Sequence, residues 1–566
     1  AWEIGVTTGP HAAPEFFTRE DIEAFYATRW QVHFNSARTG VRLLGPRPRW
    51  ARKDGGEAGL HPSNIHDTPY SVGSVDYTGD LPIILGPDGP SLGGFVCPAT
   101  VALAERWKLG QLRPGDEVRF VDVGERGAGE LRGAPGSALQ CFPDGDDGIL
   151  GRREAGPAAP SVTWRRSGDD NLLVEYGEMV LDLGLRMRVH ALAEAVAREH
   201  VPGVLELTPG VRSLQVKLDP DRLDLRRALG LVRGLEDELP ATRELAVSSR
   251  AVHLPLSWDD PATREATQRY MARVRDDAPW CPWNIEFIRR VNGLEDVEQV
   301  RRIVYQAEYL VLGLGDVYLG APVATPLDPR DRLVTTKYNP ARTWTAENSV
   351  GIGGAYLCIY GMEGPGGYQF VGRTTQVWSR FRRMGPFAEE PYLLRFFDRI
   401  SWYPVGAEEL LELRADMEAG RFDPATEEGT FTLADHLDFL AAEADSITAF
   451  RARQAAAFAA EREAWAAAGE FDPRPEPETA PPAREVTVPP GAVVVEAPCT
   501  ASVWRIEVRP GDAVSSGDRL LTLEAMKTET ALEAPCDGEV ADVLVGVSDH
   551  VESGRALVVV IPRAAP

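Results

Sequence analysis

The sequence has few cysteines and no long apolar segment, and both shortages narrow the classes of protein that it can encode. Its 6 cysteines form no CxxC pair, and its 9 histidines form no HxH or HxxxH pair. Neither a disulfide scaffold nor a metal site is therefore expected, and the low cysteine number fits a reducing compartment. No apolar run reaches the roughly 18 residues that a membrane-spanning helix needs. We therefore expect a cytoplasmic protein without a membrane partner.

The chain also lacks a starting Met, a signal peptide and an excess of basic residues. Residues 1–5 have neither the basic segment nor the apolar core of a signal peptide, and we expect the chain to be a piece of a longer protein. The formal charge of −25 repels nucleic acid, so no nucleic-acid partner is expected. A length of 566 residues with 43% hydrophobic content predicts a soluble protein of several domains.

Composition changes along the chain predict six segments and a β-rich α+β fold class. Two long segments contain short β-like runs with Gly/Pro turns, a third alternates strands and helices, and a fourth is expected to be helical. A proline-rich linker, expected to be extended and mobile, then leads to a small β-rich domain. The predicted segments are 1–158, 161–255, 256–405, 406–470, 471–488 and 489–564.

Individual helices and strands are predicted where caps and periodicity agree. A helix is expected from Thr18 to Arg29, because Thr18 can cap it and Asp21 places a carboxylate in its first turn. The α+β unit should contain the strands 171–176, 203–207 and 211–216 and the helices 186–199 and 222–235. Two more helices are expected, at about 262–275 and 294–309.

A repeat near the C-terminus surrounds a single lysine. Ala497-Pro498-Cys499 recurs as Ala534-Pro535-Cys536, 37 positions later, and Asp512 and Val514 recur at the same spacing as Asp549 and Val551. A fixed period with the same residue types indicates two copies of one unit. Lys527, in Ala525-Met526-Lys527-Thr528, lies between the copies, where a hairpin would present one amine.

This segment resembles the biotinyl domain of biotin-dependent carboxylases, whose usual Ala-Met-Lys-Met is here Ala-Met-Lys-Thr. The resemblance implies a barrel-sandwich domain in which Lys527 carries biotin covalently, beside Met526. It also implies a biotin protein ligase as a partner. An ordinary surface lysine in a turn is the plain alternative. A lipoyl domain is another, although that family usually carries Asp-Lys-Ala.

Two glycine-rich segments, residues 59–96 and 313–374, are too unusual to be generic loops. Glycine is placed where the backbone turns sharply or approaches a ligand closely. No GxxxxGK[ST] loop occurs, and Gly313-Leu314-Gly315 lacks the strand–glycine–helix setting of a dinucleotide site. A pair of turn-rich β-barrels would explain the glycines alone. The polar residues between them favour a binding crevice.

Both segments resemble the carboxyltransferase region of the urea carboxylase family, which includes guanidine carboxylases and the two-part allophanate hydrolase and 5-oxoprolinase-like proteins. The resemblance covers essentially the whole chain. It implies cyclophilin-like barrels in two lobes, the first within 1–158 and truncated, and the second made of the α+β subdomain 161–255 and the barrel 256–405. It further implies that the ATP- and Mg-using biotin carboxylase is absent, so that an active site between the lobes could be incomplete.

By this resemblance, the chain is part of an ATP-dependent ligase of nitrogen metabolism. It would transfer the carboxyl group of carboxybiotin to urea, giving allophanate, with the biotin carboxylase and an allophanate hydrolase as partners. A guanidine carboxylase with the same mechanism is one alternative. A non-catalytic carrier or scaffold subunit is another. A hydrolase or regulator like the free-standing two-lobe relatives is disfavoured by the fused biotinyl domain.

Candidate site residues are taken from polar positions in the two matching segments. Cations could hold the transferred carboxyl group, and the other polar side chains could contact the substrate. A structural ion pair or a barrel-edge hydrogen bond is the alternative for each of them. Asp76 could favour guanidine, because a carboxylate suits a cationic acceptor better than a neutral one. The candidates are Lys337, Arg342, Arg373 and Asp76 for catalysis, Asn64, His66, Asp76, Glu347 and Asn348 for the substrate, and Lys527, Met526, Gly353 and Gly354 for the cofactor.

Overall fold

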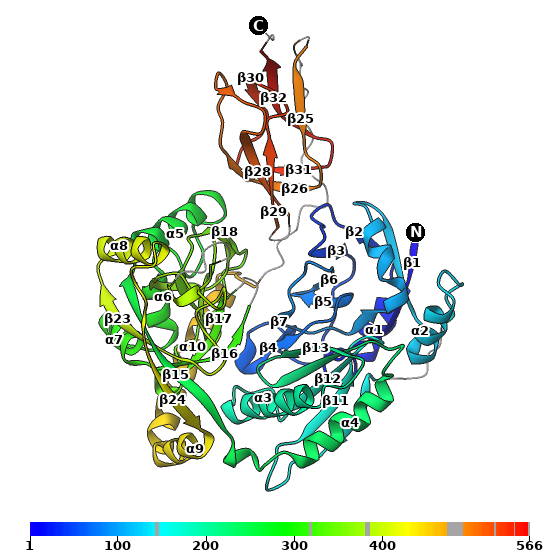
Figure 1. Ribbon diagram of the computed structural model, residues 1–566, viewed down its shortest axis with the longest axis vertical. Helices are drawn as coiled ribbons and strands as arrows, with labels where there is room; N and C mark the ends of the chain where they lie inside the picture. The colour runs from blue at the N-terminus through cyan, green and yellow to red at the C-terminus, as the bar shows by residue number, and fades with distance from the viewer. Residues whose placement is uncertain are drawn as a thin grey trace.

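The computed structural model describes residues 1–141, 147–315, 320–379, 385–471, 489, 491–525, 528–547 and 549–563. Two lobes lie side by side, and the C-terminal domain lies against their shared end (Figure 1). None of the described helices is both long enough and apolar enough to cross a membrane. The expected linker, residues 471–488, lies outside the described residues except for Phe471.

The first lobe contains a closed seven-stranded barrel in the order β1-β8-β5-β6-β3-β2-β9. Strand alternation places Val75 and Tyr77 in its core and Asp76 on the opposite face. Helix α1 begins after Thr18, whose side chain and that of Asp21 form the expected capping box. The barrel strands are β1 (Trp2–Thr8), β2 (Trp30–Val32), β3 (Gly40–Leu44), β5 (Ser74–Thr78), β6 (Leu81–Leu85), β8 (Ala99–Val101) and β9 (Glu117–Asp122), with α1 (Arg19–Ala27) and α2 (Gly124–Gly133) beside them.

A two-stranded ribbon lies outside this barrel. Strand β4 (Asn64–Pro69) pairs with β7 (Leu92–Phe95), and β4 also contacts β14 (Ser213–Leu218) of the next subdomain. The ribbon therefore lies between the barrel and that subdomain, and it carries the candidates Asn64 and His66.

The expected α+β unit is confirmed as a five-stranded sheet, β10-β11-β12-β14-β13, with two helices. Its apolar core includes Leu172 and Val174 from the central strand and Val189 and Leu192 from the first helix. These pairs follow the two-residue period of a strand and the roughly 3.6-residue period of a helix. The elements are β10 (Ile149–Arg153), β11 (Val162–Arg166), β12 (Asn171–Tyr176), α3 (Leu183–Arg198), β13 (Val204–Pro209) and α4 (Leu225–Glu238).

The second lobe contains a barrel of seven strands, β22-β19-β20-β17-β16-β23-β15, which the pairing of Trp258 with Gly372 closes. Helices α6 and α7 cover it and add Ile288 and Val300 to its core. The elements are β15 (Ala246–Trp258), α5 (Pro261–Arg273), α6 (Asn284–Val291), α7 (Val297–Gln306), β16 (Tyr309–Leu314), β17 (Pro322–Pro326), β18 (Arg342–Thr345), β19 (Ser349–Gly353), β20 (Tyr356–Ile359), β21 (Gly364–Gly366), β22 (Gln369–Arg373) and β23 (Arg399–Val405).

Two predictions in this part of the chain need correction. The segment 406–470 is not helical throughout, because β24 (Ala425–Thr432) lies between α8 (Ala407–Glu418) and α9 (Leu433–Ala442), before α10 (Ala444–Ala467). Strand β24 is rich in threonine and pairs with the outer edge of β15, which offers backbone groups to a β-branched segment. Helix α6 was not predicted, because it is only 8 residues long.

The C-terminal domain consists of two four-stranded sheets that the sequence repeat relates to one another. The orders are β25-β32-β30-β27 and β29-β28-β26-β31, so each strand of one sheet has its counterpart at the same position in the other. The strands are β25 (Val493–Glu496), β26 (Ala501–Ile506), β27 (Ala513–Val514), β28 (Arg519–Ala525), β29 (Thr528–Glu533), β30 (Gly538–Val543), β31 (His550–Val551) and β32 (Ala556–Pro562). The expected fold class is confirmed.

Candidate functional site

The described candidate residues lie in four places, two in the second lobe and two in the first. The first place surrounds Tyr368. The Lys337 ammonium lies 5.1 Å from the centre of its ring, and Nη1 of Arg342 donates to its carbonyl oxygen at 2.7 Å. A side chain at Gly353 would place its Cβ 2.5 Å from the same ring. Three candidates thus meet at one tyrosine, and the adjacent Gly354 has a φ of +60°, which also requires glycine.

The two cations at this place differ in exposure. Arg342 is 1% exposed, and its guanidinium lies 4.2 Å from the Tyr338 ring centre and 3.8 Å from that of Phe370. Lys337 is exposed. A contact between Arg342 and a substrate would require this stacked side chain to move, whereas Lys337 is already accessible.

The second place is organised by Arg414 of α8, which sequence inspection missed. Its Nη1 donates to Oδ1 of Asn348 at 2.5 Å, and its Nη2 donates to Glu347 at 2.7 Å. Nε of Arg373 donates to the Glu347 carbonyl oxygen at 2.9 Å. Burial, followed by the nearby Arg414, lowers the pKa of Arg373. Three candidates are thereby linked to one another through Arg414.

His66 and Asn64 lie at the third place, on the ribbon of the first lobe. Nδ1 of His66 lies 2.5 Å from the hydroxyl of Tyr356 on β20, so this contact joins the two lobes. Burial, and then the Arg212 charge, lower the pKa of His66 to about 4, and the ring is neutral at pH 7. Oδ1 of Asn64 accepts from the backbone N–H of His61 at 3.0 Å and so holds the preceding loop.

Asp76 lies on the outer face of the first barrel and is 4% exposed. Its Oδ2 accepts from Oγ1 of Thr78 at 3.5 Å. After burial, the Asp76 charge is the next cause that raises the pKa of Tyr70 and of Cys97.

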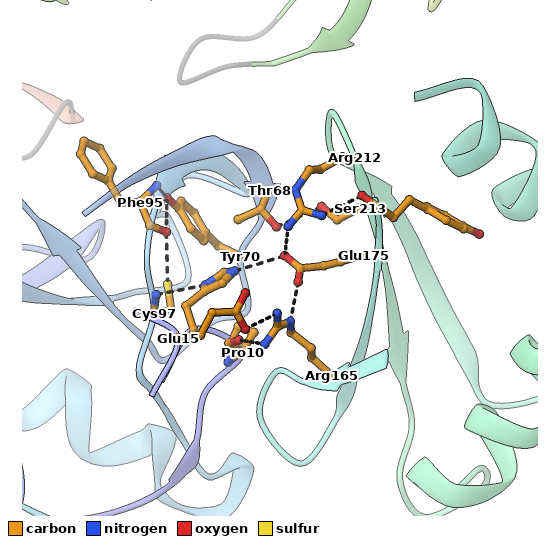
Figure 2. A network of polar contacts seen from close by, with 12 residues as sticks. Pro10, Glu15, Thr68, Tyr70, Phe95, Cys97, Arg165, Glu175, Arg212 and Ser213 are labelled. Atoms are coloured by element: carbon orange, nitrogen blue, oxygen red, sulfur yellow. Dashed lines mark hydrogen bonds and ion pairs between the residues drawn. The ribbon is translucent and has the colours of Figure 1, made fainter. Parts of the chain in front are cut away.

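A buried ionic network, which sequence inspection also missed, joins the first lobe to the α+β subdomain (Figure 2). Glu175 on β12 is contacted by Arg165 of β11, by Nη2 of Arg212 at 3.3 Å and by Nε2 of His11 at 3.5 Å. Nη1 of Arg165 also donates to the Pro10 carbonyl oxygen at 3.0 Å. Burial alone would raise the pKa of Glu175, but the two arginines hold it well below its usual range. Charged residues within apolar strands were the available sequence signal.

Lys527 and Met526 lie outside the described residues. The strands on either side of them are described, and β28 pairs with β29 as far as Ala525 and Thr528. Figure 1 shows β29 at the end of the C-terminal domain that faces the two lobes. The expected strand–turn–strand arrangement is therefore confirmed up to the residues that flank the lysine.

Within the described residues, no three His, Cys, Asp or Glu side chains lie close enough to hold a metal ion.

Three family models match the chain along its length. The carboxyltransferase domain matches in two parts, subdomains A and B at residues 1–122 and subdomains C and D at 162–388. The model described as biotin-requiring enzyme matches residues 484–560, which include Lys527. The urea amidolyase of Lachancea kluyveri is 40% identical over 99% of this chain, and that of Saccharomyces cerevisiae is 38% identical over the same share. The chain belongs to the urea carboxylase and urea amidolyase family.

A solved structure agrees with this assignment. The crystal structure of the Kluyveromyces lactis urea carboxylase is 39% identical and covers 99% of this chain with a TM-score of 0.80. The chain spans 31% of each of the two urea amidolyases and 50% of that solved chain. It comprises the carboxyltransferase region and the biotin carrier domain of the family.

Proposed function

We propose that this chain transfers the carboxyl group carried by biotin on Lys527 to a nitrogen of urea, giving allophanate. The similarity to urea carboxylase along the whole chain, with both the carboxyltransferase and the biotin-requiring parts present, is the observation that carries the proposal. We place this reaction in the cytoplasm. The complete enzyme would use ATP and Mg in a biotin carboxylase domain and would pass allophanate to an allophanate hydrolase.

The described residues fit a biotin-bearing lysine. Met526 and Lys527 are the two residues between Ala525 and Thr528, which pair across antiparallel strands. Biotin on the Lys527 amine would supply a ureido nitrogen that carries the carboxyl group between sites. A biotin protein ligase would attach it.

The accessible cation of the second lobe, Lys337, is the group that we assign to the transferred carboxyl group. A fixed positive charge stabilises the negative charge that develops when a carboxyl group changes partner. Arg373 is a second candidate, since its recorded hydrogen bond uses only Nε. Glu347 and Asn348, oriented by Arg414, and His66 and Asn64 of the first lobe would contact the substrate.

Guanidine is the second candidate acceptor, and Asp76 is the residue that favours it. A nearly buried carboxylate would stabilise a cationic acceptor more than a neutral one. Urea remains the main proposal, because the relatives and the solved structure that match over the whole chain are named for it. The two acceptors separate by their kcat/KM values in the complete enzyme.

The deciding experiment measures modification and transfer separately. The chain is co-expressed with a biotin ligase, and its mass should increase by one biotinyl group in wild type and not in Lys527→Arg. The biotinylated chain is then given allophanate, and the release of urea reports carboxyl transfer in the reverse direction. Biotinylation without urea release from allophanate, and without allophanate formation when a biotin carboxylase and urea are supplied, would favour a non-catalytic carrier subunit.

A further inference from the structure

The carrier domain contacts the second lobe through a polar pair at its surface. Nη2 of Arg505, on β26, donates to Oε2 of Glu363 at 3.0 Å, and Glu363 directly precedes β21 of the second lobe. The two side chains are 52% and 43% exposed. On the other side, Ala37 of the first lobe packs against the apolar core of the carrier domain. The carrier thus touches both lobes, as its position in Figure 1 suggests.

The exposure of this pair suits a contact that must form and break repeatedly. Ion pairs that remain in solvent contribute little to stability, whereas buried ones are costly to separate. A carrier that visits two sites needs a contact of this kind at each of them.

We propose that the Glu363–Arg505 pair is the docking contact that selects which face of the carrier domain meets the second lobe. This inference rests on the proposed function, because a docked carrier matters only if transfer occurs there. The surface around Glu363 is then a recognition site for a basic residue of the chain's own carrier.

The first experiment measures docking without measuring activity. Small-angle X-ray scattering of the full biotinylated chain should show a larger radius of gyration in Arg505→Glu and in Glu363→Arg than in wild type. The double variant Glu363→Arg/Arg505→Glu restores the attraction with reversed signs, and its radius should return to the wild-type value. Arg509→Glu is the matched control, because it also reverses a charge of the carrier domain. Arg509 lies in the turn whose Gly511 N–H donates to the Val540 carbonyl oxygen of β30.

The second experiment separates docking from chemistry. Urea release from allophanate is measured with biotin on Lys527 and, in a Lys527→Arg background, with free biotin in solution. Arg505→Glu should slow the tethered reaction about threefold or more and leave the free-biotin reaction unchanged. If urea is released neither with biotin on Lys527 nor with free biotin in the Lys527→Arg chain, the proposed function is rejected. The scattering result would still decide the docking contact.

An unchanged radius of gyration in the two single reversals, or a double variant as extended as they are, would overturn the proposal.

Discussion

Two interfaces between domains of this chain differ in the solvent exposure of their charge pairs. The junction between the first lobe and the α+β subdomain holds buried charges. Arg106 of the first lobe donates to Asp170, which is 4% exposed, at 2.6 Å. His11 of the first lobe contacts Glu175, which Arg165 and Arg212 of the subdomain also hold (Figure 2). The junction between the carrier domain and the second lobe has Arg505 and Glu363 half in solvent. The first arrangement suits a permanent contact, and the second suits one that opens in every cycle.

The physical reason for the difference is the cost of separating charges. A buried carboxylate such as Asp170 that loses the cation supplied by the first lobe is left without solvation, so separation of that lobe from the α+β subdomain would be strongly unfavourable. Exposed partners are solvated at once when they part. Four changes test this comparison, from the largest expected effect to the smallest.

Replacing Glu175 by Ala should have the largest effect on stability. Arg212 would remain buried without its carboxylate and Arg165 would keep only that of Glu15, and such losses cost about 3–5 kcal/mol. The free energy of unfolding, measured in urea, should fall by that amount. Glu206→Ala is the control, since Glu206 pairs with Lys217 at 3.5 Å with both side chains exposed. Similar losses in the two variants would mean that burial does not distinguish the junctions.

The burial of His66 beside Arg212 should make stability depend on pH. The folded pKa of about 4 lies below the ordinary value near 6.5, so the unfolded chain binds the proton more strongly. His66 therefore stabilises the fold fully above about pH 6.5, and this stabilisation, about 3 kcal/mol, is lost as the pH falls toward 4. Unfolding curves for wild type and His66→Gln should converge over this range. Parallel curves would show that His66 is accessible to protons in the folded state.

Replacing Asp76 by Asn tests whether the first barrel contacts the acceptor through this carboxylate. It lies on the barrel face opposite the core. If it contacts the acceptor, Asp76→Asn should shift the ratio of kcat/KM values toward urea and away from guanidine by about tenfold, equal to about 1.4 kcal/mol. The assay uses the complete enzyme with both substrates. An unchanged ratio would remove Asp76 from the site.

Arg505→Glu should have the smallest effect on stability. Because the pair is exposed, the reversal should change the free energy of unfolding of either lobe by less than about 1 kcal/mol. Thermal unfolding of the chain should therefore match wild type, while docking weakens. A large loss of thermal stability would make this junction as permanent as the one at Glu175.

Local patterns predicted a good part of the fold. The cap at Thr18, the two-residue alternation along 171–176 and the repeat from Ala497 to Ala534 each depend on residues near one another in sequence, and each is confirmed. The strand β24 was missed, because its edge position depends on β15, more than 170 residues earlier. Backbone groups of a distant strand leave no signal in the local pattern.

The sequence indicated which residue types could form the candidate site, but it did not indicate which of these residues lie together. Lys337, Arg342, Gly353 and Gly354 belong to one glycine-rich segment of the sequence, and the structure brings the first three of them to Tyr368. The role of Arg414 was not visible, since it lies on a helix some 40 residues beyond Arg373 in sequence. The whole-chain resemblance indicated the family before any geometry was known.

The sequence by itself determined the duplicated carrier domain, the lysine between its copies and the presence of two glycine-rich barrels. These features follow from periods and turns that act over a few residues. Only the tertiary structure decided which charges are buried together and which stay in solvent. His66 and Tyr356 are 290 positions apart, and their contact exists because two closed barrels bring distant strands face to face. Burial, which sets the pKa values and the strength of each ion pair, is a property of that packing and of no single segment.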